Sequence, residues 1–220
     1  MSAPAAEASG LKAAADALDD DELRILSAHA TEQTYHKNTV VVNEGDRSNS
    51  IFVILSGRVK VFLRNSDGRE MVINVLGPRE YFGELVIDED ARSASIETLE
   101  TCRFLIVTKA DFKALVTGNP DFALKLINRL MQRVRALTDN IRSLALLDVY
   151  GRVARLLLEL ATEHEGRLVV PGKLTQQDIA ERVGASREMI SRIFKDLVTG
   201  GYISIEHKHI TINRDLPERR

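Results

Sequence analysis

The sequence has little of several things, and each shortage excludes a class of structure. Its 220 residues include a single cysteine, Cys102, so no disulfide can form within the chain. One chain also cannot supply four thiolates to an iron–sulfur cluster. No stretch approaches the roughly 18 consecutive apolar residues of a membrane-spanning helix, and the N-terminal segment lacks the apolar run of a signal peptide. We therefore expect a cytoplasmic protein with no membrane partner.

The chain also lacks an excess of charge of one sign. Thirty Lys and Arg residues nearly balance 32 Asp and Glu residues, which leaves a formal net charge of −2. A nucleic-acid partner is therefore not indicated by the composition, and any such site must be local. The hydrophobic share of 44% and the charged share of 28% are typical of a globular protein with one or two domains.

Signs of catalysis are missing too. We find no metal-ligand cluster, no P-loop and no Ser/His/Asp set that can be placed together. Cys102 precedes an apolar run and is interpreted as a packed small side chain. We expect no enzyme, no catalytic residue, no bound metal and no cofactor. The histidines are scattered along the chain, at His29, His36, His164, His207 and His209.

What is present changes along the chain. Residues 1–10 are rich in Ala, Ser, Pro and Gly and are predicted to be disordered, and residues 11–30 are predicted to form a short helix. Short β-rich runs separated by Gly-bearing turns follow, which predicts a small sandwich or barrel. The runs are at 39–42, 50–57, 58–63, 70–76, 95–99 and 103–107.

A long helix is predicted from residue 120 to residue 145. Its apolar residues alternate at spacings of four and three, the pattern of a coiled-coil seam. The helix could instead pack on its own domain, but the seam holds for three heptads, and we favour a parallel dimer. The seam consists of Ala123, Ile127, Leu130, Val134, Leu137, Ile141 and Leu144.

The segment 174–205 carries the most specific pattern of the chain. Thr175 is expected to cap a helix, with Asp178 as its capping-box partner, and Gly184 to end that helix. Ser186 is expected to cap the next helix. A helix at 148–161 and a turn-rich connection at 164–173 precede this segment, and a two-stranded hairpin with His207-Lys208 near its turn follows it. The sequence thus predicts a winged helix-turn-helix.

The second helix of this motif divides into two faces. Ile190, Ile193 and Leu197 form an apolar stripe that is expected to be core. On the other face, arginine can bond guanine and glutamate can accept a hydrogen bond from cytosine, while Lys195 is better placed for phosphate. The alternative is an ordinary solvated helix surface. The candidate DNA-binding residues are Ser186, Arg187, Glu188, Ser191, Arg192 and Lys195.

The stretch FGELVIDEDARSAS at 82–95 places a carboxylate and a guanidinium on either side of an acidic loop. Together with LALLDVYGR at 144–152 and LTQQDIAERVGASREMISRI at 174–193, it resembles the CRP/FNR superfamily of bacterial transcription regulators. The resemblance covers nearly all of the chain after residue 20. It implies an α+β fold with a lead at 1–20, a jelly-roll-like β-roll for cyclic nucleotides at 21–118, a dimerisation helix at 119–146 and a winged helix-turn-helix domain at 147–220.

The resemblance also assigns roles to the stretch. Glu84 would hold a ribose hydroxyl, and Arg92 with Ser93 would bind the cyclic phosphate, which suits the chemistry of a guanidinium. Arg133 on the long helix could reach Glu84. The alternative is a structural ion pair between Glu84 and Arg92. The candidate ligand-binding residues are Gly83, Glu84, Leu85, Arg92, Ser93, Arg133 and Thr138.

Two departures from the cyclic-AMP-binding members leave the ligand open. The loop between Glu84 and Arg92 is shorter by about two residues, and Leu137 and Thr138 stand where those members offer adenine a Thr-Ser pair. Leu137 cannot hydrogen-bond a base, so adenine should bind more weakly or another ligand should be preferred. Cyclic AMP or GMP, cyclic di-GMP, and no ligand at all remain alternatives; the last describes a constitutive dimer with a purely structural β-roll.

The family implies partners as well. We expect a homodimer that binds double-stranded DNA at palindromic operators with TGTGA-like half-sites, and whose affinity is controlled allosterically by the nucleotide. The loop 164–170 would contact RNA polymerase.

Overall fold

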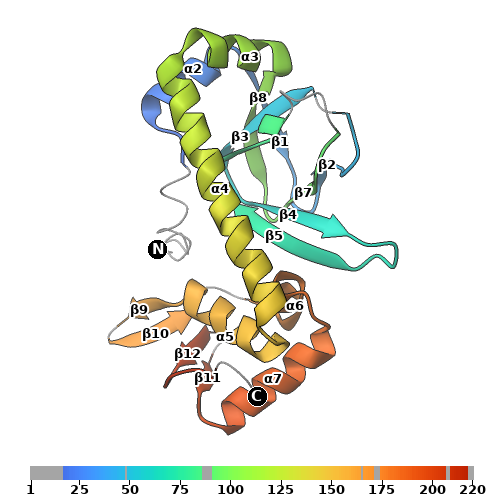
Figure 1. Ribbon diagram of the computed structural model, residues 1–220, viewed down its shortest axis with the longest axis vertical. Helices are drawn as coiled ribbons and strands as arrows, with labels where there is room; N and C mark the ends of the chain where they lie inside the picture. Colours follow the sequence, from blue (N-terminus) through green and yellow to red (C-terminus); the bar gives the residue numbers. More distant parts are fainter. Residues whose placement is uncertain are drawn as a thin grey trace. The chain divides into compact units, whose positions relative to one another are not determined.

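The computed structural model describes residues 17–47, 49–85, 91–164, 166–170, 174–206 and 209–217. It divides into two compact units, of which the first ends at Val134 and the second begins at Arg135. Figure 1 shows the elements of both units along the chain. The predicted lead at 1–20 and the turn at His207-Lys208 fall wholly or mostly outside the described residues.

Two four-stranded antiparallel sheets form the β-roll of the first unit. One sheet has the order β1-β8-β3-β6 and the other the order β2-β7-β4-β5. Side chains from both sheets, among them Phe52, Val59, Ile96 and Phe104, share one buried cluster, so the sheets face each other across a common core. The strands are β1 (Ala30–Tyr35), β2 (Val40–Val42), β3 (Ser50–Ser56), β4 (Val59–Arg64), β5 (Glu70–Leu76), β6 (Tyr81–Phe82), β7 (Ser95–Thr98) and β8 (Cys102–Thr108).

Helices cover one side of this roll. α2 (Asp20–Ser27), α3 (Lys109–Gly118) and the first turns of α4 (Pro120–Leu146) lie near one another (Figure 1). Leu26, Phe112, Phe122 and Leu126 from these helices share a second buried cluster with Tyr81 and other residues of the strands. This cluster fixes the start of α4 on the sheet that carries β6, the strand that leads into Glu84.

The N-terminal helix is shorter than the sequence predicted. Of the predicted span 11–30, only Asp20–Ser27 is helical among the described residues, and Ala30 already begins β1. Asp19 caps the helix in a capping box with Glu22, which explains the late start. Strand β1 was not predicted because its sequence, ATEQTY, has no apolar alternation, and four of its six residues are exposed.

Helix α4 carries a solvent-exposed apolar stripe. Phe122, Leu126 and Arg129 are buried against the roll, which identifies the inward face. Most of the predicted seam lies elsewhere on the helix and is exposed, with Val134 at 62% and Ile141 at 66% exposure. Ile127, Leu137 and Leu144 are exposed too, whereas Ala123 and Leu130 are partly buried. Most side chains of the seam are therefore not buried in the core of their own chain.

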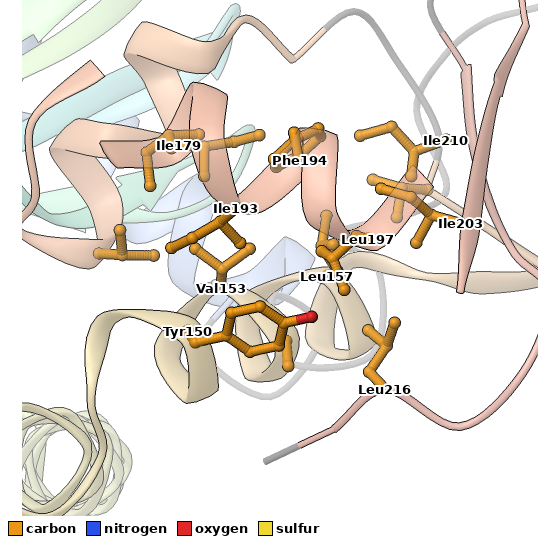
Figure 2. Close-up of a cluster of buried hydrophobic side chains, with 14 of the residues drawn as sticks. Tyr150, Val153, Leu157, Ile179, Ile193, Phe194, Leu197, Ile203, Ile210 and Leu216 are labelled. Carbon is orange, nitrogen blue, oxygen red and sulfur yellow. The ribbon is translucent and has the colours of Figure 1, made fainter. Parts of the chain in front are cut away.

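The second unit has a single buried core, drawn in Figure 2. Its four-stranded sheet has the order β11-β12-β10-β9, and the helices contribute Tyr150, Val153, Leu157, Ile193 and Leu197 to the core. Arg152 ties the start of α5 to its surroundings, because it donates to the carbonyls of Leu147 and Val183 at 3.0 and 2.8 Å. The elements are α5 (Val149–Leu160), β9 (Thr162–His164), β10 (Arg167–Val170), α6 (Gln176–Val183), α7 (Arg187–Thr199), β11 (Ile203–Glu206) and β12 (His209–Ile212).

Candidate nucleotide and nucleic-acid sites

The turn between α6 and α7 is built as its sequence predicts. The Thr175 hydroxyl accepts from the Asp178 amide at 3.1 Å, and the Asp178 carboxylate accepts from the Thr175 amide at 2.8 Å. Gly184 adopts a left-handed conformation with φ of 67°, which ends α6. The Ser186 hydroxyl then accepts from the Met189 amide and caps α7. These local contacts set where α6 begins and ends and where α7 begins.

Helix α7 separates its two faces. Ile190, Ile193, Phe194 and Leu197 are buried in the core (Figure 2 shows the last three), as the apolar stripe predicts. The polar face is exposed to solvent and presents three cations and one carboxylate. Its members are Arg187, Glu188, Ser191, Arg192 and Lys195.

The charge of Glu188 is favoured by its position at the start of α7. Hydrogen bonds from its own amide and from Ser186 lower the pKa of its carboxyl, with Arg187 and Arg192 adding to the effect. A carboxylate at a helix N-terminus is also stabilised by the helix dipole. Glu188 is thus ionised at neutral pH and can accept hydrogen bonds.

Gly83 lies at the centre of the second candidate site. Its φ is 88°, a conformation that favours glycine, and a Cβ there would lie 2.9 Å from the Ser50 carbonyl oxygen and would collide with the Arg92 guanidinium. Only glycine at position 83 therefore leaves room for the Arg92 guanidinium to lie against the backbone directly after β6. Glu84 and Leu85 continue as a short 3₁₀ turn.

Arg92 is half-buried and is held by backbone contacts. Its guanidinium donates to the Ser50 carbonyl at 2.7 Å, and its amide donates to the Asp46 carbonyl at 2.9 Å. Burial lowers the pKa of Arg92, and the charges of Glu84 and Asp46 oppose that shift. Within the described part of the chain, no carboxylate forms a salt bridge with this guanidinium. A cation buried without a direct counterion favours an anionic ligand.

Glu84 pairs with Arg133 and not with Arg92, so the alternative of a structural Glu84–Arg92 ion pair is wrong. The Arg133 Nη1 to Glu84 Oε1 distance is 2.7 Å, and the two side chains are only 16% and 10% exposed. Arg133 also donates to the Tyr81 carbonyl at 2.7 Å, and its guanidinium carbon lies 4.7 Å from the centre of the Tyr81 ring. The predicted contact between α4 and Glu84 is present.

The other predicted ligand residues are placed less tightly. Leu85 is 53% exposed, and Ser93 is also exposed. Thr138 lies on α4 beyond Val134, in the second unit, and is exposed. Between Glu84 and Arg92, residues 86–90 are outside the described residues. The structure therefore brings together Gly83, Glu84, Arg92 and Arg133.

Two groups of this site were missed by sequence reasoning. The Ser50 carbonyl holds Arg92, and Tyr81 holds Arg133 with both its ring and its carbonyl. A backbone carbonyl leaves no mark in a sequence. Tyr81, by contrast, lies three residues before Glu84, and an aromatic residue so close to the Gly83-Glu84 pair was a usable signal for a cation–π partner.

Comparison with known proteins follows the same division of the chain. A family model for the cyclic nucleotide-binding domain matches residues 32–119, and one for the Crp-like helix-turn-helix domain matches residues 151–215. A CRP-like cAMP-activated global transcriptional regulator of Mycobacterium tuberculosis is 34% identical over 184 residues, which cover 81% of this chain and 82% of the relative. This chain belongs to the CRP/FNR superfamily of transcription regulators.

Two further CRP/FNR proteins are similar over most of their length. The cAMP-activated global transcriptional regulator Vfr of Pseudomonas aeruginosa is 32% identical over 195 residues, covering 85% of this chain and 91% of Vfr. The c-di-GMP-responsive global regulator CLP of Xanthomonas campestris has a solved structure with a TM-score of 0.79 and 25% identity, covering 88% of this chain and 99% of CLP. The chain is a DNA-binding regulator with the α+β fold of this family.

The curated relatives are regulators and not enzymes. Within the described ranges, no group of three or more His, Cys, Asp or Glu side chains is arranged to hold a metal ion. None of the helices described combines the length and the apolar character needed to cross a membrane.

Proposed function

We propose that this CRP/FNR regulator is a homodimer whose DNA binding is controlled by a cyclic nucleotide in the β-roll. The observation that carries the proposal is the position of two opposite charges beside Gly83. Arg92 offers a guanidinium that forms no salt bridge with any carboxylate of the described residues, and Glu84 offers a carboxylate held by Arg133. A phosphate suits the first group and a ribose hydroxyl suits the second.

The seam of α4 is proposed as the dimer interface. An exposed apolar stripe of this length is unfavourable in water, and a second copy of the helix would cover it. The stripe comprises Ile127, Leu130, Val134, Leu137, Ile141 and Leu144.

Ile141→Glu tests the dimer, because it places a charge in the middle of the stripe. Asn140→Glu is the matched control, since it adds the same charge at the neighbouring exposed position outside the seam. Sedimentation of both variants at micromolar concentration should show dissociation for Ile141→Glu only. A monomeric wild-type protein would contradict the dimer.

The same helix links ligand and dimer. Arg133, which holds Glu84, immediately precedes Val134 of the seam. A ligand that moves Glu84 therefore acts on the helix that sets the spacing of the two recognition helices. To shift the dimer from 1:99 to 99:1, the nucleotide must favour one arrangement by about 5.5 kcal/mol in total, shared between two sites.

For the operator we propose TGTGA-like half-sites about one turn of DNA apart, read by the exposed face of α7. Glu188→Ala should relax discrimination at one base pair per half-site, by roughly 1–3 kcal/mol. Lys195→Gln should instead weaken all sequences alike and reduce the salt dependence. Competition binding with operators changed one base pair at a time separates the two effects. Unchanged sequence preference in Glu188→Ala would show that α7 docks differently.

The nucleotide itself has two supported alternatives. Relatives described as cAMP-activated are 34% and 32% identical to this chain, and a structural neighbour described as c-di-GMP-responsive is 25% identical with a TM-score of 0.79. Leu137 and Thr138 replace a polar pair for adenine, which favours weaker binding of cyclic AMP. Calorimetry with cyclic AMP, cyclic GMP and cyclic di-GMP decides between them, and heat from none of the three would favour a constitutive dimer.

RNA polymerase is proposed as a further partner, at the β9–β10 hairpin. A hollow of about 430 Å³ lies beside this hairpin, lined by Leu158, Arg167, Leu168, Arg214 and other residues. Leu158 and Leu168 are exposed, as a protein contact requires. Leu168→Glu should reduce transcription activation in vitro while operator binding stays unchanged.

A further inference from the structure

Residues 18–22, at the start of α2, contact both elements that form the proposed nucleotide site. The Leu18 amide donates to the Arg79 carbonyl at 2.8 Å, and the Arg79 guanidinium pairs with the Asp20 carboxylate. Arg79 lies in the turn just before β6, the strand that leads into Glu84. The same segment reaches α4 through Glu22. We call residues 18–22 the α2 brace.

The contact between the brace and α4 is a buried, two-point ion pair. Arg129 donates from Nη1 to Glu22 Oε1 at 2.6 Å and from Nη2 to Glu22 Oε2 at 2.5 Å. The two side chains are only 9% and 3% exposed. Arg129 also donates to the Ala17 carbonyl at 3.2 Å. A bidentate pair of this kind fixes direction as well as distance.

The pair is tied to the capping of α2. Glu22 Oε2 accepts from the Asp19 amide at 2.8 Å, so the same carboxylate closes the capping box and binds Arg129. One turn earlier on α4, Lys125 pairs with Asp19 at 2.5 Å. Two successive turns of α4 are thus held by the first residues of α2.

Arg129 and the proposed site lie one helical turn apart. Arg133 follows Arg129 by four residues, which places both on one face of α4. Tyr81, at the start of β6, lies with the centre of its ring 4.7 Å from the Arg133 guanidinium carbon. Burial lowers the pKa of Arg129, but the hydrogen bond and the charge of Glu22 raise it overall. The Glu22–Arg129 and Glu84–Arg133 ion pairs therefore lie on successive turns of one face of α4.

We propose that the α2 brace positions the nucleotide site: it holds α4 and the segment 79–84 at the spacing at which Arg133 reaches Glu84. The proposal rests on the proposed function, since it assumes that Glu84 binds a nucleotide. Glu22 and Arg129 bind each other, and in this proposal they act on the nucleotide only through Arg133. Replacing a buried ion pair by residues of similar volume often leaves stability unchanged, so this pair is better explained by orientation than by stability.

The test uses the full chain with Glu22→Gln/Arg129→Met. Gln keeps an acceptor for the Asp19 amide, its own amide can donate to the freed Ala17 carbonyl, and Met fills the volume of the Arg129 stem. We expect calorimetric affinity for cyclic AMP, cyclic GMP or cyclic di-GMP, whichever the wild type binds, to fall about three- to tenfold. The ligand-free Tm should stay within a few degrees, because no buried charge is left unpaired.

The matched control is Glu32→Gln/Arg103→Met. This ion pair has a distance of 2.5 Å and joins β1 to β8 in the same unit, but its side chains are 46% and 54% exposed and no contact connects it with Glu84 or Arg133 in the described part of the unit. Its nucleotide affinity should equal that of the wild type.

The binding results separate failure of the brace from failure of the proposed function. Nucleotide binding at wild-type affinity by the Glu22→Gln/Arg129→Met variant overturns the brace and leaves the proposed function standing. A wild type that binds none of the three cyclic nucleotides overturns the proposed function and the brace together. If the double variant does not fold, Arg129→Lys carries the same test, because it keeps the charge and loses the two-point contact. Wild-type affinity in Arg129→Lys would then overturn the proposal.

Discussion

The β-roll and the recognition helix hold their functional side chains in opposite ways. In the roll, Glu84 and Arg133 are nearly buried and bind each other, and Arg92 is held by a backbone carbonyl. On α7, Arg187 and Arg192 project into solvent from a helix whose other face is core. The roll side chains are thus fixed by contacts within their own unit, whereas the α7 side chains are exposed to solvent.

The difference follows from the partners. A small nucleotide makes few contacts, so it binds well only if ordering the side chains of its site costs little entropy. DNA offers many phosphates and a regular groove, and long exposed cations gain from counterion release. Buried charges should consequently govern stability and ligand affinity, and exposed charges should govern DNA affinity and its salt dependence.

Replacing one arginine in each region should give the largest difference in the free energy of unfolding. Arg133→Met leaves the Glu84 carboxylate buried without its partner and should lower the free energy of unfolding by about 3–5 kcal/mol. Arg187→Met, at an exposed position, should change it by less than about 0.5 kcal/mol while reducing operator affinity. Chemical denaturation and operator titration of both variants measure the contrast. Equal stability losses would show that the two regions do not differ as described.

A glycine substitution sharpens the description of the roll. Gly83→Ala combines a positive φ with a collision against the Ser50 carbonyl and Arg92, and should cost roughly 2–4 kcal/mol. Gly68→Ala is the matched control, because its φ is 78° but no atom lies within 4 Å of the added Cβ. It should cost only about 1 kcal/mol. Thermal unfolding compares them, and similar losses would mean that the close approach of Arg92 is unimportant.

Helix caps should matter equally for stability in both regions. Thr108 caps α3 by accepting from the Asp111 amide, and Ser186 caps α7 in the same way from Met189. Either change to alanine should cost about 1 kcal/mol of unfolding free energy. Only Ser186→Ala should also weaken operator binding, since it loosens the start of the recognition helix. A DNA effect from Thr108→Ala would argue against independent roles.

The stability of the first unit should depend on pH through Asp19, at the start of α2, and this should be the smallest of the expected effects. The hydrogen bond from Lys125, with further contributions from backbone amides, lowers the pKa of Asp19 from 3.8 to about 2. A lowered pKa means that the carboxylate stabilises the fold above about pH 4 and that this contribution is lost as the pH falls toward 2. The Tm difference between wild type and Asp19→Asn should therefore shrink over that interval. A constant difference would show that the pair with Lys125 does not hold in solution.

Much of the fold could be predicted from local patterns. Six of the eight roll strands, α4, α5 and the winged helix-turn-helix agree with the runs and spacings in the sequence. Strand β1 is polar and β6 has only two residues, so neither carries a detectable period. The prediction for α2 was too long because it relied on a heptad spacing that includes Leu18. Leu18 is buried, but it lies just before the helix begins. The domain boundaries at 118 and 146 stay predictions.

The two candidate sites also differ in how far apart in the sequence their contacting residues are. The caps and faces of α6 and α7 follow from residues that are at most eight positions apart in the sequence, and the structure agrees. In the roll, Glu84 and Arg133 are 49 residues apart, and Arg92 and Ser50 are 42 residues apart. Family resemblance indicated the first contact, but nothing in the sequence indicated Ser50 or the pairing of Glu22 with Arg129 across 107 residues.

The sequence by itself determined where the chain turns helical or extended, which face of α7 is polar, and where an apolar seam runs along α4. These properties depend on the period of side chains along a backbone, and neighbouring residues suffice to define them. Only the tertiary structure decided which buried charges meet, because a charge enters a core where folding has already placed a partner of opposite sign. The Glu84–Arg133 and Glu22–Arg129 pairs, on which the proposed nucleotide site and its brace depend, are consequences of that long-range pairing.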